Sequence, residues 1–204
     1  MIRRFAPLVA ILLIAATAFA QHRLRVRRMG VSWNDGVPRV SFGARDLVTG
    51  RIRRRIAAGR EQTISVTVQA FRTGSDRPIA SRNRTCGVTL DVWTRKYVVR
   101  IGSRSYLYDT IPEVLSRCLG FRNFRIGTAR DYVRHRGRPI LFAASAEFNP
   151  ITQRQCRELL RRSGGQSQVV GPVVISIVRR EICGAERVVS FRSQTVPVPT
   201  GGAP

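Results

Sequence analysis

The stretch TCGVTLDVWTRKYVVRI, residues 85–101, decides the fold. Within residues 86–92 apolar side chains alternate with polar ones, a period of two that gives a strand one buried face. The alternation returns in residues 97–101, and Trp93 lies at the corner between the two halves. The stretch therefore predicts a β-hairpin, and we place this hairpin at the centre of the sheet.

Short segments with the same alternation recur along most of the chain. Asp35-Gly36 and Gly74-Ser75-Asp76 are turn signals between consecutive segments, and Gly184 lies between the last two. The expected strands are residues 23–28, 31–33, 38–44, 63–72, 79–92, 97–101, 105–108, 121–126, 139–148, 173–182 and 187–196.

Helical signals interrupt the strands. Residues 47–59 carry an apolar side chain every four residues and finish with a glycine, a common helix stop. Thr110 and Glu113 fit a capping box, in which the threonine caps the helix and the glutamate reaches back to it. Gly120 ends the apolar stripe that follows, so a second helix is expected between Thr110 and Gly120.

A third helix is expected after Asn149-Pro150, since asparagine is a good N-cap and proline suits the first helical position. Residues 131–138 read as a polar loop. The predicted fold is α+β: mainly antiparallel strands in a sandwich-like arrangement with three short helices, forming a single domain over residues 21–196. The Pro/Gly-rich tail, residues 197–204, is expected to be disordered.

Residues 40–59 and 141–164 share a layout of strand, helix and glycine, and each is followed by a predicted hairpin. A duplicated β-α-β-β unit would explain this echo. We treat the duplication as a hypothesis.

The N-terminus has the parts of a secretory signal. Two arginines precede the apolar run 8–16, and small residues at 18 and 20 suit a signal peptidase that cuts before Gln21. Residues 1–20 are therefore predicted to direct export to the periplasm or the medium. The alternative is an uncleaved anchor, although the run is shorter than the roughly 20 residues of a spanning helix.

Four cysteines in an exported chain indicate disulfides. Cys86 and Cys118 both belong to predicted core faces, which makes them the preferred pair and leaves Cys156 for Cys183. Three pairings are open on sequence alone. A metal site is disfavoured, because no CxxC occurs and both histidines lie far from any cysteine in the sequence.

The chain carries 36 basic against 12 acidic residues, a net charge of +24, and Lys96 is its only lysine. Such an excess either keeps a monomer soluble by repulsion or indicates an anionic partner, such as an envelope surface or an acidic protein. Export argues against nucleic acid as the natural partner. The densest basic cluster is the predicted anion-binding site, with a solvated helix face as the alternative; it consists of Arg51, Arg53, Arg54, Arg55 and Arg60.

No enzyme motif is present: GxSxG, HExxH, the P-loop and the dinucleotide-binding GxGxxG are all missing. His135 is crowded by arginines that disfavour its charged form, and Glu147 reads as an arginine's partner. We therefore expect a non-enzymatic binding domain without a cofactor. The alternative is an assembly protein that binds another protein through its sheet edge or an aromatic corner made of Trp33, Trp93, Tyr106 and Tyr108.

Residues 86–100, 106–119 and 140–152 resemble an exported bacterial family known only as a domain of unknown function (four-three-nine-zero). The turn of that family has the pattern Leu-x-x-x-Thr-Arg-x-Tyr, which Leu90, Thr94, Arg95 and Tyr97 match here. The resemblance spans roughly residues 23–160 and implies a fold without assigned catalytic residues. The four cysteines and the predicted C-terminal hairpin depart from the family's pattern.

Overall fold

The computed structural model describes residues 24–151, 154–158 and 184–200. Its strands are β1 (Arg25–Val26), β2 (Gly30–Asn34), β3 (Val37–Gly43), β4 (Gln62–Arg72), β5 (Pro78–Asp91), β6 (Lys96–Ile101), β7 (Arg104–Tyr108), β8 (Gly120–Arg125), β9 (Pro139–Phe148), β10 (Arg187–Arg192) and β11 (Val196–Pro197). Its helices are α2 (Gly50–Ala57), α3 (Ile111–Leu119) and α4 (Ala129–Tyr132), with the 3-10 turns η1 (Arg45–Leu47) and η2 (Val133–His135). Residues 154–158 are helical as well.

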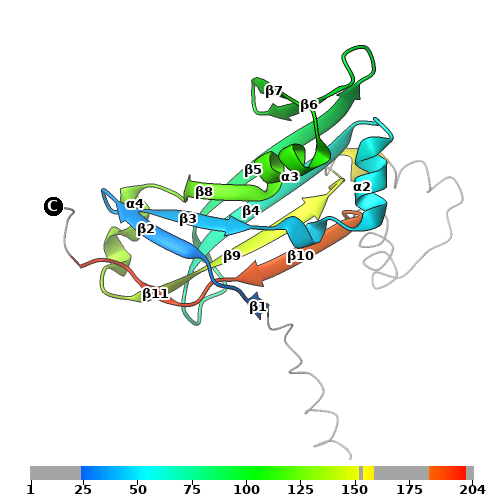
Figure 1. Cartoon of the computed structure of the whole chain (residues 1–204). Helices are drawn as coiled ribbons and strands as arrows, with labels where there is room; N and C mark the ends of the chain where they lie inside the picture. The colour runs from blue at the N-terminus through cyan, green and yellow to red at the C-terminus, as the bar shows by residue number, and fades with distance from the viewer. Residues whose placement is uncertain (1–23, 152–153, 159–183, 201–204) are drawn as a thin grey trace, which may run out of the picture.

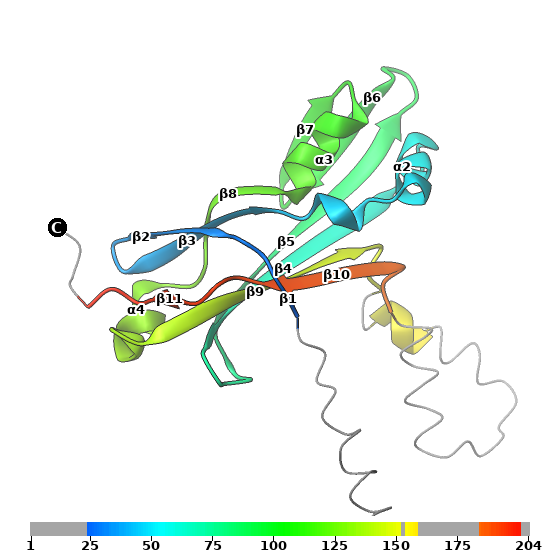
Figure 2. The ribbon, with the colours of Figure 1, turned by 60° about the horizontal axis from the view of Figure 1, so that its bottom comes forward.

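Two sheets form the framework. The eight-stranded sheet has the order β1-β10-β9-β4-β5-β6-β7, with β11 beside β9, and its strands are antiparallel except for β1 against β10. The three-stranded sheet β2-β3-β8 is antiparallel. Together with α2 and α3 it covers one face of the large sheet (Figure 1, Figure 2). The predicted α+β, mainly antiparallel fold is confirmed.

The core lies between the large sheet and the layer that covers it. Alternate residues of β4 from Ile64 to Ala70 are fully buried. β9 places Phe142 opposite Ala70 and Ala144 opposite Val68, so large side chains face small ones across the ladder. The covering layer contributes Val40, Ala44, Leu47, Ile52, Ile56, Val114, Leu119 and Phe121 to this core.

The predicted hairpin is present, but its central position was wrong. β5 and β6 pair with Leu90 opposite Tyr97, as the alternation indicates. The centre of the sheet is β4, which pairs with β5 on one side and β9 on the other, whereas β6 is next to the edge strand β7. The hairpin turn extends beyond the covering layer, because Val92 is 71% exposed and Trp93 is 92% exposed.

The first two predicted helices form, each with a cap. Thr49 accepts a hydrogen bond from the backbone of Ile52 at 3.4 Å, so α2 starts three residues later than expected, after the short turn η1. Gly59 follows the helix with φ +80°, a left-handed conformation that glycine adopts without strain. The capping box of Thr110 and Glu113 at α3 is confirmed.

Residues 131–138 were predicted as a loop, and this was wrong for their first half. A second capping box, made by Thr128 and Asp131, starts α4. Tyr132 is buried, and its hydroxyl donates to the carbonyl of Ile126 at 3.0 Å, which anchors the helix to the end of β8. Helix α4 forms because the ring of Tyr132 is buried in the core. The polar composition of residues 131–138 does not reveal this buried position.

The C-terminal tail was predicted to be disordered, and this was wrong for its described part. β11 pairs with β9, and the side chain of Val198 is buried. The backbone of Val198 accepts from Gly137 at 2.9 Å and donates to Arg138 at 3.1 Å. Residues 201–204 lie outside the described residues.

The start of the described chain lies against its end. β1 pairs in parallel with β10, with Arg25 opposite Phe191. Met29 and Gln194 exchange two hydrogen bonds: the Met29 amide donates to Gln194 Oε1 at 3.2 Å, and Gln194 Nε2 donates to the Met29 carbonyl at 2.9 Å. The first and last described segments therefore lie at the same edge of the large sheet.

The preferred disulfide is present: Cys86 of β5 and Cys118 of α3 are bonded, with their Cα atoms 5.7 Å apart. The bond joins the sheet to the helix above it, and both residues are buried. Cys156 is disulfide-bonded too, and Cys183, its predicted partner, lies outside the described residues. Among the described residues, no helix combines the length and apolar character needed to cross a membrane.

Several predictions concern residues that the structure does not describe. These are the signal segment 1–20, most of the third helix and the strand 173–182. The proposed duplication stays a hypothesis. Its two equivalent strands, β3 and β9, belong to different sheets.

Candidate anion-binding site

The predicted arginine cluster surrounds α2. Ile52 and Ile56 are buried and hold one side of this helix against the core. The remaining directions around the helix are therefore left to solvent. The side chains of all five clustered arginines are exposed, namely Arg51, Arg53, Arg54, Arg55 and Arg60.

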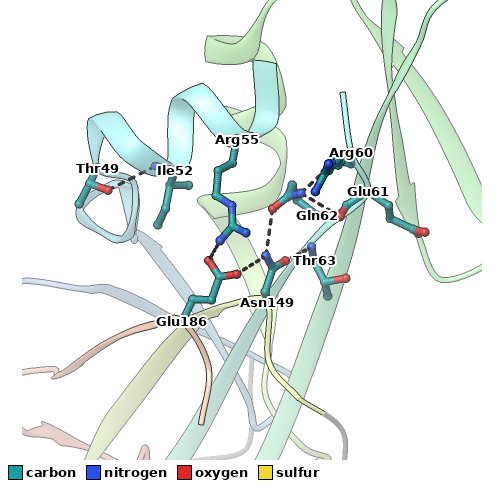
Figure 3. Close-up of polar contacts among 9 residues, drawn as sticks. All are labelled: Thr49, Ile52, Arg55, Arg60, Glu61, Gln62, Thr63, Asn149 and Glu186. Atoms are coloured by element: carbon teal, nitrogen blue, oxygen red, sulfur yellow. Dashed lines mark hydrogen bonds and ion pairs between the residues drawn. The ribbon is translucent and has the colours of Figure 1, made fainter. Parts of the chain in front are cut away.

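One of these five arginines already forms an ion pair within the protein. Arg55 forms an ion pair with Glu186, just before β10 (Figure 3). None of the other four forms an ion pair with an acidic side chain among the described residues. The predicted site is thus brought together by the structure, but with four available guanidinium groups instead of five.

Asn149 organises the polar contacts beneath α2. Its side-chain oxygen accepts from the Thr63 amide at 2.8 Å, and its amide nitrogen donates to Gln62 at 2.9 Å and to Glu186 at 3.2 Å (Figure 3). Gln62 in turn donates to the carbonyl of Arg60 at 3.1 Å. The residue connects the end of β9, the start of β4 and the carboxylate that binds Arg55.

Asn149 also has φ +47°, a left-handed conformation that asparagine tolerates better than most residues. The variant Asn149→Gly keeps this backbone geometry and removes the side-chain hydrogen bonds, so we expect it to lower the free energy of unfolding by about 1–3 kcal/mol. Asn149→Ala adds backbone strain of about 1 kcal/mol. Urea unfolding of both variants measures the two contributions, and a glycine variant as stable as the wild type would contradict the role given to the side chain.

A second group of arginines lies around a cavity of about 620 Å³. The cavity opens between α3, the end of β3 and the start of β8, on the same face of the large sheet as α2 (Figure 1). It is lined by Phe42, Gly43, Arg45, Arg84, Tyr108, Glu113, Ser116, Arg117, Gly120, Phe121 and Arg122. Sequence analysis missed this group because its four arginines are scattered from position 45 to position 122.

Arg84 lies deepest in this group, under the C-terminus of α3. Its Nη2 donates to the carbonyls of Arg117 at 3.2 Å, Cys118 at 3.2 Å and Gly120 at 2.9 Å. Its guanidinium carbon lies 3.6 Å from the centroid of the Phe121 ring. These contacts cap the negative end of the helix dipole with a cation, which is favourable.

Arg84 nevertheless occupies an electrostatically poor position. Burial disfavours its charged form, and the nearby charge of Arg117 adds to this, so that its pKa falls to about 10. The Nε atoms of Arg84 and Arg117 are both buried without a hydrogen-bond partner. Two neighbouring cations thus each keep one unsatisfied donor, a combination that an anion would relieve.

The lining contains a single acidic residue, and it is already engaged. Glu113 accepts hydrogen bonds from the amide of Thr110 at 3.0 Å and from its hydroxyl at 2.9 Å, as the second half of the α3 capping box. Arg117 lies over the ring of Tyr106 at 4.1 Å instead of pairing with an acid. With four arginines against one carboxylate, the lining of the cavity keeps an excess of positive charge.

The aromatic residues predicted to share one corner do not do so. Trp33 packs edge-on against Tyr132, 5.5 Å between ring centroids, whereas Trp93 is exposed at the turn between β5 and β6. β2 and this turn lie at opposite ends of the molecule (Figure 1). Tyr106 lies under Arg117, and Tyr108 lines the cavity.

Metal chemistry finds no support in the described ranges, where no group of three or more histidine, cysteine or acidic side chains is placed to hold an ion. Comparison of the chain with family models, with curated proteins and with solved structures gives no match. The resemblance to the exported bacterial family stays a prediction.

Proposed function

We propose that this protein is an exported, non-enzymatic domain that binds an anionic surface or an acidic protein through its arginines. The observation that carries the proposal is the cluster at α2: Arg51, Arg53 and Arg54 on the helix and Arg60 just after it are exposed without an acidic partner among the described residues. Guanidinium groups bind carboxylates and phosphates in a bidentate manner, so several on one helix suit a polyanion.

The distribution of ion pairs supports this reading over simple solubility. The ion pairs among the described residues include Arg55 but none of the other four clustered arginines. The ion pairs formed between described residues are Arg27–Asp46, Arg55–Glu186, Lys96–Asp109 and Arg100–Glu61. The buried Ile52 and Ile56 hold the helix against the core, so the arginines project from a backbone of fixed position.

Export is supported by the sulfur chemistry. The disulfide between Cys86 and Cys118 connects two core elements, and such bonds form and persist in oxidising compartments. This agrees with the signal segment predicted at residues 1–20. An envelope or extracellular location would bring the protein next to anionic lipid headgroups and acidic polymers.

The test compares two variants with the same loss of charge. In the first, Arg51, Arg53, Arg54 and Arg60 become glutamine, which keeps helix propensity. In the control, four exposed arginines away from α2 become glutamine, namely Arg72, Arg77, Arg130 and Arg134. Binding is measured by co-sedimentation with phosphatidylglycerol vesicles and by retention on heparin, over a range of salt concentrations.

We expect the α2 variant to bind at least about tenfold more weakly, since each arginine near an anionic surface contributes about 1 kcal/mol. The control variant should retain most of the affinity, and wild-type binding should weaken steadily with salt. An equal loss of affinity in both variants would show that binding depends on net charge and not on the α2 cluster. Binding that does not respond to salt would contradict the proposal.

One observation favours the alternative of protein binding at the sheet edge. β7 pairs only with β6 among the described strands, and Leu107 on it is 61% exposed close to the protruding Trp93 turn. An edge strand with exposed apolar side chains can accept a partner strand. A partner that stays bound at high salt and is lost on Trp93→Ala would support this alternative instead.

A further inference from the structure

The cavity beside α3 is a better-defined site than the arginine surface. We propose that it binds the phosphate monoester group of an organic ligand, with the phosphate between Arg84 and Arg117 and the organic part against the aromatic lining. This inference does not depend on the proposed function, because none of the α2 arginines lines the cavity. Either can therefore fail without the other.

Charge in the cavity comes from independent parts of the fold. Arg45 belongs to η1, Arg84 to β5, Arg117 to α3 and Arg122 to β8. Arg84 and Arg117 are half-buried, whereas Arg45 and Arg122 are exposed at the rim. A solvated helix face explains exposed arginines on one element, but it does not explain four arginines that converge from four elements.

Two residues of the lining each keep a buried donor without a partner. The Nη2 of Arg84 donates to the carbonyls at the end of α3, whereas its buried Nε–H has no hydrogen-bond partner. The buried Nε–H of Arg117 is in the same state. Arg84 supplies the hydrogen bonds that cap α3, and Arg117 lies in the last turn of the same helix. The charge of Arg117 disfavours the charged form of Arg84, and an anion bound between the two turns this repulsion into attraction.

The chemistry of the lining selects a phosphate monoester over a smaller anion. A phosphate dianion offers enough oxygens for several guanidinium groups at once, and Arg binds it in a bidentate manner. The hydroxyl of Ser116 is exposed at the same cavity and supplies another donor. The phosphate thus satisfies the cations without involving the engaged Glu113.

Size and apolar surface require more than a bare phosphate. A volume of about 620 Å³ falls within the range of small-molecule sites and exceeds what one phosphate fills. Phe42, Tyr108 and Phe121 supply aromatic surface along the same wall. A phosphorylated small molecule and a phosphate-bearing lipid headgroup share this chemistry, and the experiment separates the two sources.

The direct test follows the guanidinium groups by NMR. Protein labelled with ¹⁵N-arginine is titrated with inorganic phosphate and with glycerol 3-phosphate, and the Nε–H signals are assigned through single Arg→Gln variants. We expect the signals of Arg84 and Arg117 to shift in a saturable way, with tighter binding for glycerol 3-phosphate. The signals of Arg51 and Arg53 on α2 should not show this saturation.

Variants separate the cavity from the α2 surface. Arg117→Gln should weaken binding of glycerol 3-phosphate about tenfold or more, because a hydrogen-bonded charge is lost. The α2 quadruple variant should bind it with unchanged affinity, and unchanged affinity in Arg117→Gln would overturn the proposal. Urea unfolding of Arg117→Gln shows whether the variant is still folded, so that a loss of binding can be assigned to the site.

The source of the phosphate is decided with vesicles of phosphatidylcholine that contain either phosphatidic acid or phosphatidylserine. Preference for phosphatidic acid that depends on Arg117 indicates a lipid headgroup with an exposed phosphate monoester. Binding of glycerol 3-phosphate without such a preference indicates a soluble ligand. If neither soluble phosphates nor phosphatidic acid vesicles shift the Arg84 and Arg117 signals, the proposed site is wrong.

Discussion

Replacing Cys86 and Cys118 together by alanine is expected to lower the free energy of unfolding by about 3–4 kcal/mol. The two residues are 32 positions apart in the sequence, and their bond closes a loop that contains β6, β7 and most of α3. Without the bond the unfolded chain gains the conformational freedom of that loop. Alanine is preferred to serine because both positions are only 1% exposed, and serine would bury a hydroxyl group there.

Guanidinium chloride unfolding of the oxidised wild type and the double variant measures this difference. The double variant removes only the bond between Cys86 and Cys118, whereas a reducing agent would also break the bond that involves Cys156. The matched control is Cys156→Ala, which leaves the loop between β5 and α3 closed. A double variant with the same midpoint and slope as the wild type would show that the bond does not constrain the unfolded chain.

Phe142→Ala is expected to cost about 3–5 kcal/mol, the range for removing a buried aromatic ring from a packed core. Phe142 is fully buried on β9, opposite Ala70 of β4. Its small neighbour cannot fill the space that the ring leaves. The loss should therefore include a cavity contribution in addition to the lost burial of the ring.

The control for this prediction is the preceding residue. Leu141 points to the face of the large sheet opposite the covering layer, where it lines a hollow of about 370 Å³ among the described residues and is only half-buried. Leu141→Ala should cost clearly less, about 1 kcal/mol, because successive side chains of a strand point to opposite faces. Urea unfolding of both variants tests the register of β9, and the reverse order of effects would place the wrong face in the core.

Local patterns predicted the elements well where one periodicity dominates. The alternation in residues 63–72 predicted β4, and the Thr110–Glu113 pair located the start of α3 to the residue. Cys86 and Cys118 were paired because both belonged to buried faces, and the structure confirms that pair. In each case the sequence pattern that supports the prediction lies within one element or depends only on which residues are buried.

The order of strands could not be obtained in this way. The hairpin of β5 and β6 has a strong pattern, but pattern strength reports burial and not position within a sheet. β4 becomes central because β9, far along the chain, pairs with its free side. The ordered tail was missed for a similar reason, since Pro197 and Val198 are fixed by the distant β9 and by residues 137–138.

The two arginine groups show the same contrast for the site. The α2 cluster is dense in the sequence, so composition alone reveals it, but the loss of Arg55 to Glu186 depends on tertiary structure. The cavity is the opposite case. Arg84 lies on a strand with an alternating pattern, and nothing local distinguishes it from other arginines of β5 until α3 and β8 are placed around it.

The parallel pair of β1 and β10 has a consequence for biosynthesis. A chain that is made from its N-terminus contains Arg25 long before the opposite residue, Phe191, is added. The hairpins β4–β5 and β5–β6 join neighbours in sequence and can form during translation. The outer edge of β9 (Pro139–Phe148) stays unpaired until β10 (Arg187–Arg192) emerges, so nascent molecules expose this strand edge to aggregation during that interval, and a chaperone would protect it.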